Sequence, residues 1–218
     1  MNVIYGNRKY KSGMEVPMKF IGITGGVGAG KSEILGYLKM RPGTKVMLAD
    51  EIAHDLMEPG TNCYEKIKEQ FAGEDIFQPD GRFDRGKMAE VIFSEEEKRK
   101  KMNAIVHPAV KEFVIETVRQ ERERGILRFL FLEAALLIEE HYDEICDELW
   151  YIYTREDIRK QRLMASRGYS EEKVHQIFDS QLSEETYRRY CKCVLDNNGT
   201  VEKTYSQLEQ ALKNIESE

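Results

Sequence analysis

The sequence predicts an α/β protein in which helices cover both faces of a parallel sheet. Apolar segments alternate with amphipathic ones along the 218 residues, as strands and crossover helices do. Residues 129–132 are continuously apolar, which is typical of a parallel strand buried on both faces. A chain of this length can bury a substantial core, either as one domain or as a domain with an insertion.

The first half of the chain alternates short strands with helices and then becomes mostly helical. In order, we expect a strand at 19–24, a helix at 31–40, a strand at 45–48, a helix at 50–57 and a helical region at 63–124. Pro59 and Gly60 end the second helix. Because proline favours the first turn of a helix, His107-Pro108 predicts a helix start, with the helix following at 109–124.

The second half returns to alternation. We expect strands at 126–132, 148–153 and 193–195, and helices at 156–166, 170–182, 184–190 and 201–215. The helical stretch between the second and third strands is too long for a simple crossover. The sequence therefore predicts a core formed by residues 18–58 and 126–217, a helical substrate-binding insert at about 59–125 and a lid at about 155–170.

A glycine-rich turn joins the first strand to the first helix. It reads Gly25-x-x-x-x-Gly30-Lys31-Ser32, which is the phosphate-binding P-loop in its expected strand–turn–helix context. Backbone N–H groups of such a turn surround an anion, the lysine reaches the outer phosphates, and the hydroxyl binds Mg²⁺. The motif predicts nucleoside triphosphate binding by Gly25, Gly28, Ala29, Gly30, Lys31, Ser32 and Glu33.

Two carboxylates follow two further strands, at the sheet edge where ligands bind in open α/β folds. Asp50 follows the second strand, and Glu133 ends the third in the position of a Walker-B acid. Asp50 could act as a base on an attacking hydroxyl, could help to hold Mg²⁺, or could cap the helix that begins at residue 51. Glu133 could equally be an exposed loop carboxylate.

A dense group of cations follows the fourth strand. Arg155, Arg159 and Arg162 are spaced to share one helix face, and Arg167 precedes Gly168, a possible hinge for the lid. Arginines that reach a transferring phosphoryl group stabilise its charge. The alternative is a solvated face paired with neighbouring acids. His107 is typical of a structural histidine.

Composition excludes several classes. The net charge of −6 argues against a general nucleic-acid binder, and no apolar run has the length of a membrane span. The four cysteines form neither a disulfide framework nor a zinc motif, which predicts reduced thiols in a cytoplasmic protein. Residues 1–17 are polar and precede Met18, so we interpret them as a disordered extension or the product of an upstream start codon.

Several motifs together resemble the dephospho-coenzyme A kinase family, from about residue 19 to residue 212. These are Ile23-Thr-Gly-Gly-Val-Gly-Ala-Gly-Lys-Ser32, Ala49-Asp50-Glu-Ile-Ala53, Glu58-Pro-Gly60, Asp80-Gly81, Asn103-x-x-x-His107-Pro108, Leu136-Leu-Ile-Glu139 and Val194-Leu-Asp-Asn197. The P-loop alone is generic, whereas the combination is specific.

The resemblance implies a P-loop kinase fold of three layers with an inserted substrate domain and a lid. It implies transfer of a phosphoryl group from ATP, with Mg²⁺, to the ribose 3′-hydroxyl of dephospho-coenzyme A. Asp50 would be the base, and Lys31, Arg162 and Arg167 would act on the phosphates. His107 and Glu139 are weaker candidates for substrate contact. We expect a monomer with no nucleic-acid or membrane partner.

Some positions depart from the family pattern. Leu48 replaces an acid two residues before Asp50, and Glu33 stands where a small hydroxyl residue is usual after the lysine–serine pair. Ala135, Ser166 and Lys192 also differ. Two alternatives therefore stay open: a P-loop kinase with a nucleoside or nucleotide acceptor, and a nucleotide-binding protein whose catalytic site has decayed.

Overall fold

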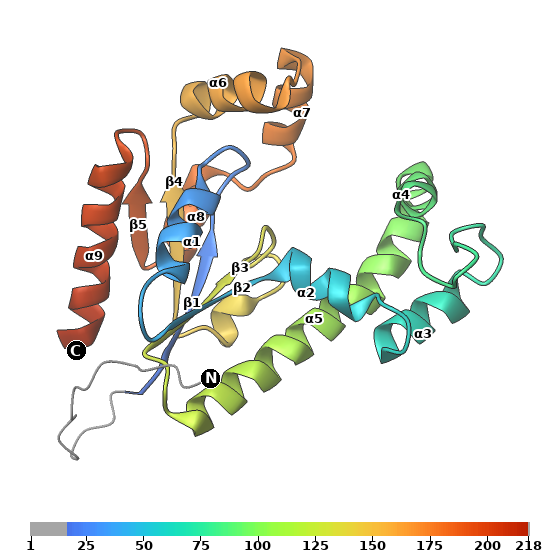
Figure 1. Ribbon diagram of the computed structural model, residues 1–218. Helices are drawn as coiled ribbons and strands as arrows, with labels where there is room; N and C mark the ends of the chain where they lie inside the picture. Colours follow the sequence, from blue (N-terminus) through green and yellow to red (C-terminus); the bar gives the residue numbers. More distant parts are fainter. Residues whose placement is uncertain (1–16, 218) are drawn as a thin grey trace.

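A five-stranded parallel sheet forms the centre of the computed structural model, which describes residues 17–217. The strand order is β2-β3-β1-β4-β5 (Figure 1). The strands are β1 (Lys19–Thr24), β2 (Thr44–Leu48), β3 (Phe129–Glu133), β4 (Glu148–Tyr153) and β5 (Cys193–Asp196). The earlier interpretation of residues 1–17 lies outside the described residues except for Pro17.

Helices cover both faces of this sheet. They are α1 (Lys31–Lys39), α2 (Ala49–Leu56), α3 (Asn62–Gln70), α4 (Arg85–Ser94), α5 (Glu96–Arg124), α6 (Glu156–Arg167), α7 (Glu171–Asp179), α8 (Glu184–Tyr190) and α9 (Val201–Ser217), with a 3₁₀ turn at Tyr142–Glu144. Figure 1 shows α5 running diagonally beneath the sheet, with α2, α3 and α4 near its N-terminal half.

The core has two layers because successive side chains of a buried strand point to opposite faces. Ile21 and Ile23 of β1 pack with α1 and α9 on one face. Phe20 packs on the other face with valines of α5. Both faces are apolar, which is the reason that these strands are continuously hydrophobic. The predicted three-layer parallel α/β fold is confirmed.

Helix α5 corrects the prediction that a helix begins after His107-Pro108. The helix runs without interruption from Glu96 to Arg124 and contains Pro108. Its buried positions recur every four residues on both sides of the proline: Met102, Val106, Val110, Val114 and Val118. Pro108 and Ala104 lie on the exposed face, so the carbonyl that loses its helical partner is open to water. Burial of one apolar stripe therefore outweighs the local preference.

Strand β3 is shorter than the predicted strand at 126–132. It begins at Phe129, opposite Lys19 of β1 and Thr44 of β2. Ile126 is 75% exposed and lies in the connection from α5. An apolar residue can extend a strand only where neighbouring strands offer backbone partners, and here both neighbours begin level with Phe129.

Candidate functional site

The P-loop lies where β1 passes into α1, at the carboxyl edge of the sheet. Two glycines are required for different reasons. Gly25 packs against β4, where a Cβ atom would come within 2.6 Å of the Ile152 carbonyl oxygen. Gly30 caps α1 in a left-handed conformation with φ 86°, which side chains disfavour. The loop thus directs the first N–H groups of α1 to one spot, as anion sites do.

The Ala29 carbonyl anchors this loop to the rest of the edge. It accepts hydrogen bonds from the Thr154 hydroxyl at 3.0 Å, the Asn197 amide at 2.8 Å and the Arg162 guanidinium at 3.4 Å. Asn197 is itself held by the Thr204 hydroxyl of α9 at 2.9 Å. Two stretches that are distant from the loop in the sequence, residues 154–162 and 197–204, therefore fix one backbone group, and the loop is preorganised before any ligand binds.

Arg159 is the arginine most closely built into the loop. It is 8% exposed, and its Nε donates to the Val27 carbonyl at 2.9 Å. Its guanidinium also bonds to the Gln181 side chain and lies over the Phe178 ring at 4.2 Å. Burial lowers the pKa of Arg159, and nearby tyrosines and Glu156 oppose part of this decrease. In the sequence, the helical spacing between Arg159 and Arg162 was the feature that identified Arg159 as a candidate.

Lys31 and Glu133 meet beside the loop. The Lys31 ammonium donates to the Gly25 carbonyl at 2.6 Å and lies 3.6 Å from the Glu133 carboxylate. Burial lowers the pKa of Lys31 and raises the pKa of Glu133, while the attraction between the two opposes both shifts. Glu133 is thus partly buried and paired with the P-loop lysine. Its alternative interpretation as an exposed loop carboxylate is wrong.

Asp50 lies near this pair and is exposed. Its charge acts on both Lys31 and Glu133, yet within residues 17–217 its carboxylate makes no hydrogen bond or ion pair. The capping interpretation is wrong, because α2 begins at Ala49, its cap is Leu48, and no side chain caps it. Asp50 is the second residue of the helix, so its carboxylate is free for another partner.

A cavity of about 180 Å³ opens next to Asp50. His107 lines it and contacts the Glu140 carboxylate at 2.7 Å through Nδ1. Apolar side chains, with Tyr142, complete the wall: Ala49, Ala53, Val106, Val110, Ala134, Ala135 and Leu136. Glu139, which the motif singled out, is exposed and does not line this cavity. Its neighbour Glu140 does, and only the turn after β3 reveals this difference.

Arg167 and Glu33, which the sequence predicted to act on or bind the phosphates, contact residues outside the P-loop. Arg167 is exposed at the end of α6, and its guanidinium lies 6.0 Å from the Tyr169 ring. The Glu33 side chain turns towards α9, where the Tyr205 hydroxyl donates to it at 2.5 Å. Ser32 is exposed in the first turn of α1, and in the described part of the chain its hydroxyl makes no hydrogen bond.

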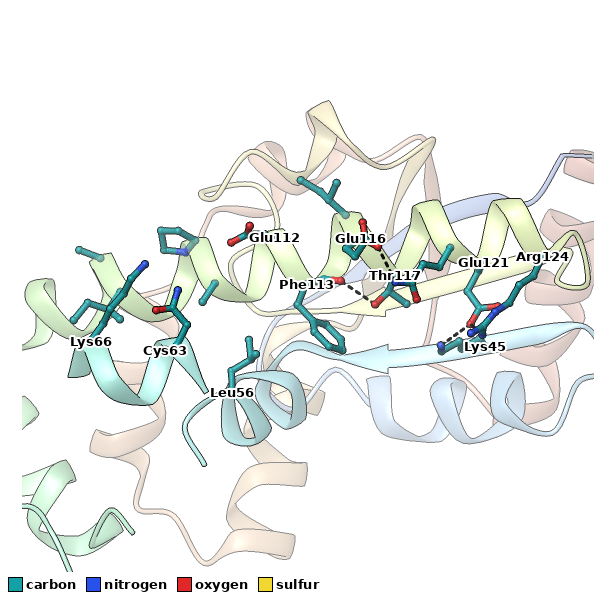
Figure 2. Close-up of a pocket in the computed structure, with 17 residues that line it drawn as sticks. Lys45, Leu56, Cys63, Lys66, Glu112, Phe113, Glu116, Thr117, Glu121 and Arg124 are labelled. Atoms are coloured by element: carbon teal, nitrogen blue, oxygen red, sulfur yellow. Dashed lines mark hydrogen bonds and ion pairs between the residues drawn. The ribbon is translucent and has the colours of Figure 1, made fainter. Parts of the chain in front are cut away.

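A larger cavity lies elsewhere. It has a volume of about 860 Å³ and lies along α5, beside β2 and α3. Figure 2 shows Lys45 paired with Glu121 at one end and Lys66 at the other. None of the residues predicted to act on a phosphate lines it. Cavity size alone therefore does not identify the functional site, because the residues predicted to act on a phosphate lie at the carboxyl edge of the sheet.

Comparison with known proteins agrees with this geometry. The profile of a family described as Dephospho-CoA kinase matches residues 19–203. A dephospho-CoA kinase of Oceanobacillus iheyensis is 37% identical over 193 residues, covering 88% of this chain and 96% of that protein. The chain belongs to the dephospho-CoA kinase family. A further member from Symbiobacterium thermophilum is 34% identical over 194 residues, covering 89% of this chain and 80% of that one.

Solved structures show the same fold. The protein TT1252 from Thermus thermophilus aligns with a TM-score of 0.73 at 30% identity, covering 91% of this chain and 98% of its own. A dephospho-CoA kinase from Campylobacter jejuni has a TM-score of 0.64 at 22% identity, covering 90% and 96%. The family resemblance inferred from the motifs is confirmed, and the protein is a kinase with an α/β P-loop fold.

Proposed function

We propose that this protein transfers the γ-phosphoryl group of ATP to the ribose 3′-hydroxyl of dephospho-coenzyme A, giving coenzyme A. The observation that carries the proposal is the unpaired Asp50 carboxylate, exposed at the edge that also holds the P-loop and Lys31. A kinase acting on an alcohol needs a group that accepts the hydroxyl proton. Membership of the dephospho-CoA kinase family supports the choice of acceptor.

The residues of the loop fit ATP with Mg²⁺. Backbone N–H groups at the start of α1 would surround the phosphates, and Lys31 would move from the Gly25 carbonyl to the outer phosphates. The exposed Ser32 hydroxyl would hold Mg²⁺, which neutralises phosphate charge when bound. Among residues 17–217 no three His, Cys, Asp or Glu side chains gather as a metal site. This fits Mg²⁺, which keeps several waters and relies on substrate phosphates.

Residues of α2 and α5 would bind the acceptor. Asp50 would accept the proton of the 3′-hydroxyl as that oxygen attacks phosphorus, and the apolar cavity beside it would receive part of the acceptor and exclude water. His107 would form part of the same wall, with its ring fixed by Glu140. The chain around α6, residues 155–170, would act as the lid, with Arg162 near the phosphates and Arg159 supporting the loop.

The test is release of ADP that depends on dephospho-coenzyme A, with the product identified by mass as the acceptor plus one phosphoryl group. We expect turnover well above the ATPase rate without acceptor. A panel of nucleosides and nucleotides addresses the first alternative: faster turnover of one of these would assign a different acceptor. ATP binding with no turnover of any acceptor would indicate the decayed site.

The setting of the protein in the cell stays a prediction. We expect a monomer in the cytoplasm without nucleic-acid partners. Within residues 17–217 no helix combines the length and apolar character that crossing a bilayer requires. Size-exclusion chromatography with light scattering would check the monomer, and a dimer would contradict it.

A further inference from the structure

The cavity beside Asp50, of about 180 Å³, is called the first cavity below. A second cavity, of about 420 Å³, lies one helical turn along α2 from Asp50. The C-terminal turn of α2 contributes His54 to its wall, and Glu58, just beyond the end of that helix, also lines it. The start of α4 and the turn before it contribute Arg82 and Arg85. This cavity has no part in the chemistry described above, yet it carries three basic side chains.

The two cavities lie on adjoining parts of one helix face. Residues four apart share a face of an α-helix and are separated by about 6 Å along its axis. Asp50 and His54 have this spacing, and they line the first and second cavities respectively. A molecule bound at Asp50 that extended towards the C-terminal end of α2 would therefore reach His54.

Arg85 is the arginine of the second cavity that is available to bind an anion. Its Nη2 lies 2.6 Å and 3.0 Å from the two ring nitrogens of His54, and because a guanidinium only donates, the unprotonated ring nitrogen accepts and orients it. In the described part of the chain Arg85 forms no ion pair. A guanidinium has five N–H donors in a planar fork, and most of these stay free here.

The carboxylates near Arg85 have other partners. Glu58 lies 3.7 Å from Arg82. The Asp84 carboxylate caps α4, accepting from the Gly86 and Lys87 N–H groups. The capping also occupies two N–H groups at the start of α4, and Arg82 already faces Glu58, so Arg85 is the arginine of this cavity that has no acidic partner among residues 17–217.

We propose that Arg85, oriented by His54, binds the 5′-diphosphate of the acceptor nucleotide. This rests on the proposed function. In dephospho-coenzyme A the 3′-oxygen and the 5′-phosphate belong to one ribose, joined through C3′, C4′, C5′ and O5′. With the 3′-hydroxyl at Asp50, the diphosphate projects either into the first cavity or along α2. The first cavity is mostly apolar, His107 in it already contacts Glu140, and its two carboxylates, Asp50 and Glu140, repel phosphate. The Arg85 side offers a planar donor that phosphate oxygens match.

The test compares Arg85→Gln with the parent enzyme. Loss of a charged hydrogen-bond donor predicts a rise of about 10- to 100-fold in the KM and the Kd for dephospho-coenzyme A. The KM for ATP and kcat should change less than about threefold, which also shows that the variant is folded. Arg85→Lys should recover part of the affinity, since the charge returns without the planar fork.

Two controls make the result specific. Lys87→Gln removes a cation two residues away that pairs with Asp75 at 2.6 Å and does not line the cavity, so it should leave the KM unchanged. Adenosine lacks the diphosphate, so its inhibition constant against dephospho-coenzyme A should be equal in the parent and in Arg85→Gln. Three results would overturn the proposal. They are a KM for dephospho-coenzyme A in Arg85→Gln equal to that of the parent, a rise in KM in Lys87→Gln as large as in Arg85→Gln, and a loss of adenosine inhibition in Arg85→Gln as large as the loss of affinity for dephospho-coenzyme A.

The same experiment separates this proposal from the proposed function. A parent protein that turned over no dephospho-coenzyme A would contradict the function. Its Kd for that compound, measured by calorimetry with no turnover needed, would still decide the subsite: weaker binding by Arg85→Gln supports it, and equal binding overturns it.

Discussion

Replacing Arg159 with methionine tests whether the P-loop depends on the buried arginine of α6. Methionine keeps the apolar stem and removes the guanidinium. The change deletes the bond to the Val27 carbonyl at 2.9 Å, the bond to Gln181 and the contact over Phe178 at 4.2 Å. A hydrogen bond to a charged group contributes about 1.5–3 kcal/mol, and a desolvated cation–π contact about 2 kcal/mol or more.

These contributions are partly offset because the buried guanidinium no longer has to be desolvated, which is also the main reason its pKa is lowered. We therefore expect the free energy of unfolding to fall by about 2 kcal/mol. The loop carbonyl of Val27 loses its support, so the Kd for ATP should rise at least about tenfold, equivalent to ~1.4 kcal/mol. Urea unfolding and calorimetric titration with ATP measure the two effects.

Arg167→Met is the matched control, since it changes the same residue type on the same helix. Arg167 is exposed, and its nearest aromatic contact is 6.0 Å away. We expect a change in unfolding free energy below about 0.5 kcal/mol. Equal losses of stability and ATP affinity in the two variants would refute the argument, because burial and contact with the loop would then have no weight.

Three further results are expected. Asp50→Asn should keep its affinity for ATP and lose about 10²–10⁴-fold in turnover, measured by ADP release, because an amide cannot accept the proton; unchanged turnover would remove Asp50 from that role. Gly26→Ala should weaken ATP binding in calorimetry, because its Cβ would clash with the Arg159 guanidinium and displace it from the loop; normal binding by Gly26→Ala would count against this packing. Burial raises the pKa of Cys146 to about 12. Thiolate is therefore scarce at pH 8, and the native thiol should react with an aromatic disulfide reagent far more slowly than the urea-unfolded one; equal rates would contradict the burial.

The sequence alone determined the loop that we propose binds phosphate. A strand–turn–helix with Gly25, Gly30, Lys31 and Ser32 is local in the chain, so its geometry follows from its own backbone preferences. Continuous apolar runs determined the parallel sheet, because only strands buried on both faces lack alternation. The motif combination also indicated the family, and the position of Asp50 at a strand end followed from the rule for open sheets.

Tertiary structure decided which of several similar residues meet. Arg159 and Arg167 lie in one cationic run, yet only Arg159 is enclosed by the loop and α7. Glu139 and Glu140 are neighbours, and the turn after β3 brings the second to His107. The phosphate loop is anchored by Asn197, which is 168 positions along the chain from its Ala29 partner.

The physical reason for this division is the range of the interactions. Backbone conformation and hydrophobic periodicity act between residues close in sequence, so they can be read from the chain. Side-chain partners and burial depend on segments that meet only after folding. Pro108 illustrates both: its local preference predicted a helix start, and the buried valine stripe of α5 carried the helix through it.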